Sequence, residues 1–120
     1  MPGERRERPD VLPSETRRIR TGYGKVYTTI SFDDNGQMFE VFVQTGDSGD
    51  YTNAWCDALG KTISNALRSG VDPEIVAQDL MGIRADRVAE DNGDKILSIP
   101  DAVGTAMMRA CDVDRDGGGD

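Results

Sequence analysis

Positively charged side chains gather around one glycine turn in a chain that is otherwise acidic. Arg18 and Arg20 alternate along a predicted strand, so their side chains share one side, and the turn Thr21–Gly24 separates them from Lys25. Glycine lets the backbone approach a ligand closely, so this strip could bind a phosphate or a carboxylate. The alternative is that these basic side chains form ion pairs with the many aspartates nearby, since surface ion pairs are common.

A second candidate is the glycine-rich loop Thr45–Asp50, which leads from a predicted strand into a predicted helix. Backbone N–H groups at a helix N-terminus attract anions, and small residues let them point inward. The two aspartates of this loop would repel a phosphate, unless the arginines of the basic strip lie across from the loop. The candidate ligand-binding residues of both regions are Arg18, Arg20, Tyr23, Lys25, Ser48, Gly49, Tyr51 and Thr52.

Catalysis by this chain is not expected. The sequence contains no histidine, which removes Ser-His-Asp and Cys-His mechanisms and the most common general base. The tetrapeptide Gly46–Gly49 (GDSG) matches the nucleophile loop of trypsin-like proteases, but without a histidine the match is a coincidence. No pair of carboxylates stands out for acid–base work. We therefore expect a non-enzymatic protein without a cofactor.

Metal binding is not expected either. The run Asp112–Gly117 has acids at positions one, three and five of a calcium loop and glycine at six, but the glutamate required at position twelve has no counterpart before Asp120. A solvated acidic tail is the preferred interpretation. Cys56 and Cys111 both fall in helical patterns and are expected to be buried or idle thiols.

The composition is that of a globular domain with an acidic surface. The 120 residues are 37% hydrophobic and 30% charged, and no apolar run is long enough to span a membrane. The first ten residues are charged rather than a hydrophobic leader, so the cytoplasm is the expected compartment. The net charge of −8 disfavours nucleic acid as a partner. An aspartate-rich, lysine-poor surface suits a high-salt cytoplasm, although a GC-rich genome would produce the same bias.

Alternating apolar residues predict an antiparallel hairpin. In the second strand of this hairpin Phe39 is expected to point inward. Met38 and Phe42 of the same strand, and Tyr27 of the first strand, are expected on the outer face. The connection Asp33–Gly36 contains Asn-Gly, which accepts the positive φ angles of tight turns. Together with a shorter strand before the hairpin, the expected strands are Arg17–Thr21, Lys25–Phe32 and Met38–Gln44.

Helical spacing predicts three helices. The longest pattern lies within Gly46–Gly70, with Trp55 anchoring its inner face. Asp72–Pro73 begins a short helix, and Pro100 opens a last one after a short strand at Lys95–Ser98. We therefore expect an α+β fold, in which a small antiparallel sheet with a β-hairpin core is packed on one face by two to three helices. The expected parts are a flexible arm (1–15), one domain (16–111) and a disordered acidic tail (112–120).

Five segments in order carry a resemblance to a known family. They are RRIRTGYGKVYTTI, FEVFVQTGDSG, DALGKTISNALRSGVDP, GIR and LSIPDAVG. The set resembles the TSCPD domain, found at the C-terminal end of adenosylcobalamin-dependent (class II) ribonucleotide reductases and in small stand-alone proteins. The likeness covers about Arg17–Met108.

The resemblance also shows where this chain departs from the family. Members carry cysteines at positions that correspond here to Tyr23, Tyr51, Ala85 and Ile99. Four thiols would suggest a metal site, and with all four replaced no metal is expected. The reductase's radical-carrying and substrate-reducing cysteines lie in a barrel that this chain lacks, so reductase activity cannot be carried over.

Two hypotheses of function follow. The first is a non-catalytic accessory or regulatory module that docks on a ribonucleotide reductase or on itself. The second is a small-ligand-binding protein that binds or sequesters a nucleotide-like anion. Because a small sheet leaves edges and an outer face to cover, we also expect a homo-oligomer.

Overall fold

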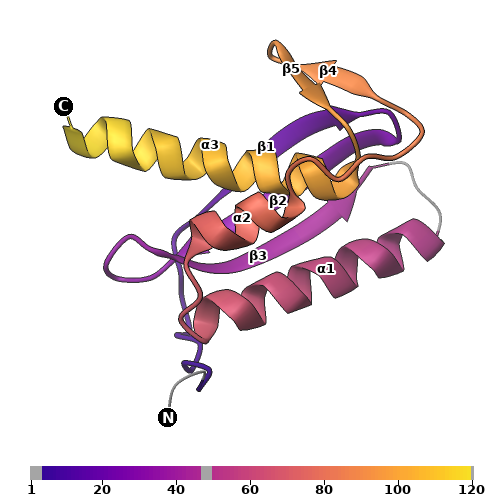
Figure 1. The fold of residues 1–120 in the computed structure, drawn as a ribbon. Helices are drawn as coiled ribbons and strands as arrows, with labels where there is room; N and C mark the ends of the chain where they lie inside the picture. Colours follow the sequence, from indigo (N-terminus) through magenta and orange to yellow (C-terminus); the bar gives the residue numbers. More distant parts are fainter. Residues whose placement is uncertain (1–3, 47–49, 120) are drawn as a thin grey trace.

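Three antiparallel strands form the main sheet, and helices lie to one side of it. The structure is a computed structural model that describes residues 4–46 and 50–119, without side chains at 50–51 and 112–119. The elements in order are β1 (Ser14–Thr21), β2 (Gly24–Phe32), β3 (Met38–Thr45), α1 (Asp50–Arg68), α2 (Pro73–Leu80), β4 (Ala89–Asp91), β5 (Asp94–Ile96) and α3 (Ile99–Gly119) (Figure 1). The expected α+β fold with a small antiparallel sheet is confirmed.

The main sheet has the strand order β1-β2-β3. The Asp33 carboxylate organises the β2–β3 turn by accepting hydrogen bonds from the backbone N–H groups of Asn35 and Gln37, at 2.9 and 3.0 Å. The register then shifts beside this turn, so that Met38 lies opposite Phe32 and Phe39 is the extra residue of a bulge.

This bulge overturns one prediction about the outer face. Met38 turns into the core instead of outward. Strict alternation from Val41 back along the strand would place Phe39 inside the core, but one extra residue moves every side chain beyond it to the opposite face. Phe39 is buried as well, beneath two arginine guanidinium groups rather than among the core side chains.

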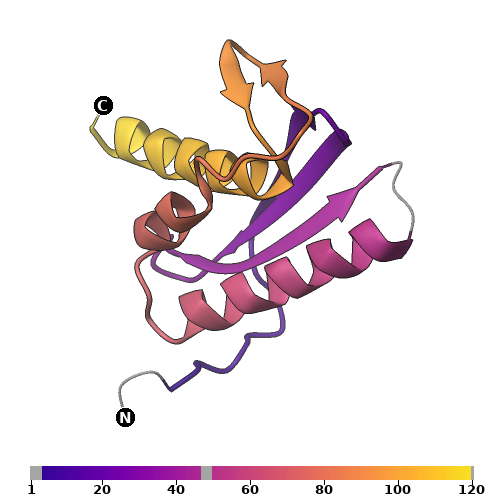
Figure 2. The same ribbon diagram turned by 45° about the vertical axis from the view of Figure 1, so that its right-hand side comes forward.

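Helix α1 runs alongside β3 and covers the edge of the sheet (Figure 2). Ser64 Oγ donates to the carbonyl of Val41 and accepts from its N–H, both at 3.0 Å. Gly60 brings the helix close, because a Cβ at this position would lie 3.1 Å from the Val41 carbonyl oxygen. The helix therefore satisfies backbone groups that a bare edge strand would leave open.

The inner face of α1 differs from the prediction at one position. Cys56, Ile63 and Leu67 face the core, whereas Trp55 is 62% exposed. Ile63 and Leu67 were expected on this face, so the prediction is wrong at the start of the helix, where Cys56 is buried instead of its neighbour Trp55, about 100° around the axis. The expected end of the helix is confirmed: Gly70 has φ +95°, and its N–H and that of Val71 close a Schellman motif on the last turn.

Helices α2 and α3 form the other wall of the core. Asp72 caps α2 by accepting from the Glu74 N–H at 2.9 Å, and Pro73 occupies the first turn as expected. Gly104 lets the helices cross closely, since a Cβ there would lie 2.7 Å from the Ala77 carbonyl oxygen. Fully buried side chains on α3 make it the central helix of the core: Ala102, Val103, Ala106, Met107 and Ala110.

A small hairpin, β4–β5, projects beyond one end of the sheet. Its two turn residues, Asn92 and Gly93, have φ of +49° and +87°, as a tight two-residue turn requires. Arg109 from α3 holds this hairpin through Asp91 and Asp94, both at 2.8 Å. Strand β4 was not predicted from the sequence.

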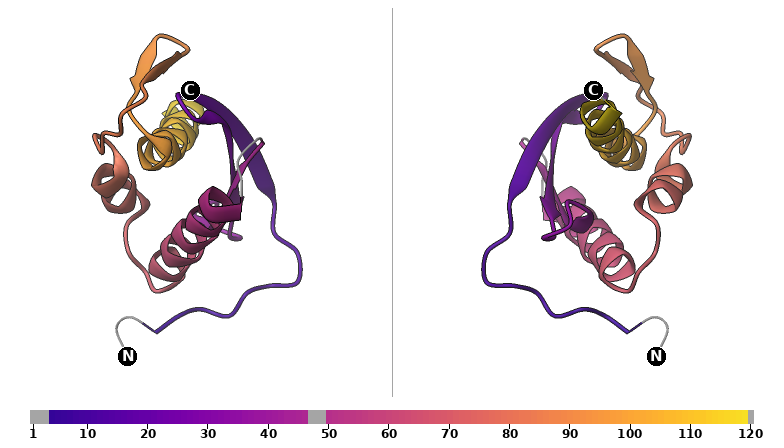
Figure 3. Two further views of the ribbon diagram at one scale, coloured as in Figure 1. Left: turned by 90° about the vertical axis from the view of Figure 1, so that its right-hand side faces the viewer. Right: turned by 90° about the vertical axis from the view of Figure 1, so that its left-hand side faces the viewer.

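The N-terminal residues pass beneath the sheet and reach the end of α1 (Figure 3). The division of the chain into a flexible arm, a domain and a disordered tail concerns motion and stays a prediction. None of the helices within the described residues is long and apolar enough to cross a membrane.

Candidate functional site

An apolar groove of about 500 Å³ opens between the N-terminal half of α1, the loop after α2 and the start of α3. Its walls are mostly aliphatic and aromatic, and Trp55, a largely exposed residue, stands at its side. We call this site the apolar groove; it is lined by Tyr23, Thr52, Trp55, Cys56, Leu59, Leu80, Ile83, Ala85, Ser98, Ile99 and Pro100.

The β1–β2 turn holds Tyr23 at one edge of the groove. Thr21 Oγ1 donates to the Gly24 carbonyl at 2.7 Å and accepts from the Tyr23 N–H at 3.0 Å. Gly22 lies against the backbone of Arg87, where a Cβ would approach the Arg87 carbonyl oxygen to 2.6 Å. The Arg87 N–H in turn donates to the Tyr23 hydroxyl at 3.2 Å. The turn is therefore shaped by backbone contact between segments far apart in sequence.

Ser98 and Asp101 hold the opposite wall. Ser98 Oγ donates to the Ile83 carbonyl at 2.6 Å and accepts from the Asp101 N–H at 3.0 Å, which also caps α3. The buried Asp101 carboxylate accepts from the N–H groups of Gly82 and Leu97, at 2.9 and 2.8 Å. The polar residues of the LSIPD segment thus fix two loops in place, and their hydrogen-bonding groups are directed into the protein.

The described side chains of the groove suit the binding of an apolar group. Cys56 lies at its base, almost fully buried, and burial raises the pKa of its thiol, which disfavours the nucleophilic thiolate. Ser98 is engaged by its loop partners. The walls therefore offer apolar surface and aromatic rings, which suit an uncharged apolar group.

The predicted ligand-binding residues fall into two separate places. Tyr23 and Thr52 line the apolar groove. The cations Arg18, Arg20 and Lys25 come together elsewhere, around a polar pocket of about 280 Å³ that Glu90, Asp91 and Asn92 complete. Ser48 and Gly49 lie outside the described residues, as does the side chain of Tyr51.

Asp91, one of the two acidic residues that line this polar pocket, is already engaged. Asp91 accepts from the Arg20 N–H at 3.0 Å and pairs with Arg109 at 2.8 Å. Burial acts to raise the pKa of Asp91, but these hydrogen bonds and the positive charge of Arg109 outweigh it and hold the pKa below its ordinary value. Arg109 therefore offsets part of the negative charge that faces the cations.

Comparison with known proteins places the fold in a family. The family model of the TSCPD domain matches residues 3–111. The chain belongs to the TSCPD domain family. No curated protein and no solved structure matches it.

The apolar groove of this TSCPD domain gathers positions that the resemblance had singled out. Tyr23, Ala85 and Ile99, which stand where other members carry cysteine, all line it. Among the side chains that the structure describes, no group of three or more His, Cys, Asp or Glu could hold a metal ion.

Other lining residues were not predicted from the sequence. Trp55 was assigned to the core, and Leu80 and Ile83 gave no signal of a site because they meet the groove only after distant loops come together. An apolar residue adjacent to, but outside, the buried stripe of a helix is the one local signal that could have indicated Trp55.

Proposed function

We propose that this TSCPD domain is a non-catalytic binding module, related to the C-terminal domain of class II ribonucleotide reductases, that docks on a reductase through the apolar groove. One observation carries the proposal: a largely exposed tryptophan stands beside an apolar groove of about 500 Å³. Tryptophan is enriched among residues that dominate binding energy at protein interfaces. The absence of histidine from the sequence supports a role without catalysis.

Binding to a purified class II reductase from the same host tests this proposal. With the chain immobilised, Trp55→Ala should weaken binding about tenfold or more, as expected for an interface hot spot. Ile75→Ala is the matched control, because Ile75 is also an exposed apolar residue but does not line the groove. A reductase that binds wild type and Trp55→Ala equally well, or binds neither, contradicts the proposal.

A second candidate function is anion binding at Arg18, Arg20 and Lys25. It is supported by the convergence of three cations on one small pocket and by the pairing of Asp91 with Arg109. A nucleotide that binds the folded state should raise the melting temperature, and Arg18→Ala should abolish the rise. Arg84→Ala is the control, since Arg84 does not line this pocket. If nucleoside mono-, di- and triphosphates leave the melting temperature unchanged, this function is excluded.

Self-assembly is supported by the outer face of the sheet. In the left view of Figure 3, no helix of the described chain covers this face, and Phe42 on it is 48% exposed. We expect a dimer or larger species in light scattering, which Phe42→Glu should dissociate because it places a charge in an apolar contact. Ile75→Glu, on α2, should leave the mass unchanged. A monomeric wild-type chain would refute this arrangement.

A further inference from the structure

We propose that Phe39, Glu40 and the C-terminal end of α1 form a binding site for an extended segment with two arginines separated by one residue. Residues 5–9 of the same chain occupy it here, and the arm of a second copy presents the same chemistry. This site, called the arginine site below, lies at the end of α1 opposite the apolar groove. It does not depend on the proposed function of that groove.

Arg6 binds at three places on the protein. Its guanidinium lies 4.8 Å from the centre of the Phe39 ring, on which Arg68 also stacks at 5.1 Å. It pairs with Asp33 at 3.0 Å and donates to the carbonyl of Leu67 at 3.1 Å. The backbone carbonyls at the C-terminal end of α1, including that of Leu67, carry partial negative charge, so a cation is favoured there.

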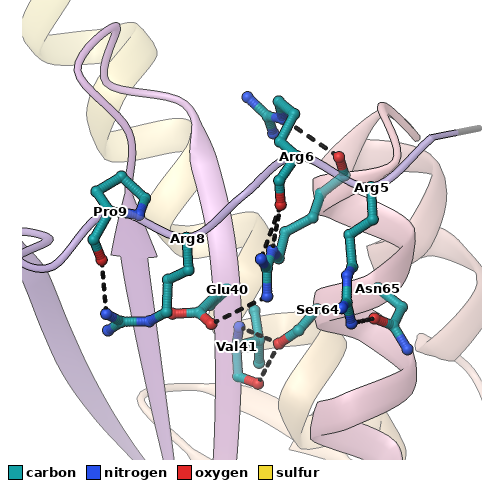
Figure 4. Close-up of polar contacts among 9 residues, drawn as sticks. Arg5, Arg6, Arg8, Pro9, Glu40, Val41, Ser64 and Asn65 are labelled. Carbon is teal, nitrogen blue, oxygen red and sulfur yellow. Dashed lines mark hydrogen bonds and ion pairs between the residues drawn. The ribbon is translucent and has the colours of Figure 1, made fainter.

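The backbone of the arm is recognised as well. The Arg6 N–H donates to the Arg68 carbonyl at 3.0 Å, and the Arg68 guanidinium donates back to the Arg6 carbonyl at 2.7 and 3.0 Å (Figure 4). Recognition of both the main chain and a charged side chain defines the register of an extended peptide.

Arg8 fills the second part of the site. Its Nε lies 2.8 Å from Oε1 of Glu40, and Arg68 approaches the other carboxylate oxygen at 3.8 Å. Only 7% of the Glu40 side chain is exposed. Without Arg8 this carboxylate keeps only the longer contact with Arg68, and breaking the shorter ion pair of a buried carboxylate is costly, so the site prefers arginine at this position.

The asymmetry of burial distinguishes a receptor from its ligand. The acceptor groups belong to the folded sheet and helix, whereas the Arg6 and Arg8 side chains remain 46% and 42% exposed. No residue of the arm belongs to the hydrophobic core cluster. The arm can therefore leave without opening the core, and another segment of the same chemistry can replace it.

A full-length variant frees the site for a direct test. Arg6→Ala/Arg8→Ala should keep its circular dichroism spectrum and bind a labelled peptide of residues 4–10 (ERRERPD) at least about tenfold more tightly than wild type, whose own arm competes. The peptide with Arg5 replaced by alanine should bind almost as well, because the Arg5 side chain donates to Asn65 at the surface and not to Phe39, Glu40 or Asp33. The peptides lacking Arg6 or Arg8 should not bind.

Two results would overturn the proposal. One is a folded double variant that does not bind the peptide. The other needs only the single substitution Glu40→Gln: trypsin cleavage after Arg5 and Arg6 should become at least about fivefold faster, because the arm loses its buried charged partner. An unchanged cleavage rate, with Glu90→Gln as the control, contradicts the arginine site even if the double variant does not fold.

Discussion

At the scale of single residues, Asp101 of the LSIPDAVG segment holds the loops that line the groove. Its carboxylate satisfies the N–H groups of Gly82 and Leu97, which lie on two different loops. Asp101→Ala leaves both donors without this acceptor, so we expect the free energy of unfolding to fall by about 2–4 kcal/mol. Urea denaturation measures the loss. Asp79→Ala, at an exposed position of α2, should change it little, and equal effects of the two substitutions would contradict this role.

Gly22 tests the close packing of the β1–β2 turn. Gly22→Ala places a Cβ within 2.6 Å of backbone atoms of Arg87, which cannot move aside as a flexible side chain would. We expect a loss of about 1–3 kcal/mol in thermal or urea unfolding. Gly46→Ala is the matched control, because its Cβ would meet only the Tyr27 ring at an ordinary 3.7 Å. If Gly22→Ala proves as stable as Gly46→Ala, the turn does not require the close approach.

At the scale of the elements, α1 acts as a cover for the edge of β3. Ser64→Ala removes the hydroxyl that satisfies both backbone groups of Val41, so we expect a loss of about 1–2 kcal/mol. Alanine favours helix more than serine does, so the loss would occur despite a gain in propensity. The exposed Thr62 gives the control: Thr62→Ala should be neutral or stabilising. If Ser64→Ala leaves the free energy of unfolding unchanged, water satisfies the two backbone groups of Val41 in place of the hydroxyl.

Elements that depend on local rules were predicted well from the sequence. Asp72 and Pro73 begin α2, and Gly70 ends α1, because capping depends on residues within one turn. The bulge at Phe39 and the burial of Cys56 in place of Trp55 could not be predicted, since both are decided by packing between distant segments. Trp55 has the larger apolar side chain, yet Cys56 is the residue buried in the core.

The candidate site was predictable only in part, for the same reason. The resemblance singled out Tyr23, Ala85 and Ile99 individually, but a sequence cannot show that three positions so far apart line one groove. The cations of the polar pocket were identified from alternation within one strand and its neighbour. Asp91, which completes this pocket, and Arg109 of α3, which pairs with Asp91, were found only in the folded chain.

At the scale of the whole molecule, two aspartates tie remote segments to opposite ends of the sheet. Asp33 holds the N-terminal arm through Arg6, and Asp91 holds α3 through Arg109. For both carboxyls burial acts to raise the pKa, but hydrogen bonds from backbone N–H groups and from these arginines outweigh it, so each pKa lies below the ordinary value of 3.8.

The depressed pKa values of Asp33 and Asp91 predict an acid-sensitive fold. Since the unfolded chain takes up these protons at higher pH than the folded chain, the stabilisation is complete above about pH 5 and is lost as the pH falls through and below 3.8. Melting temperatures between about pH 5 and pH 3 should fall less steeply in Asp33→Asn/Asp91→Asn than in wild type, because asparagine does not titrate there. Asp79→Asn should keep the wild-type slope. Equal slopes in all three chains would show that other carboxyls carry the acid sensitivity, and would contradict the lowered pKa values of Asp33 and Asp91.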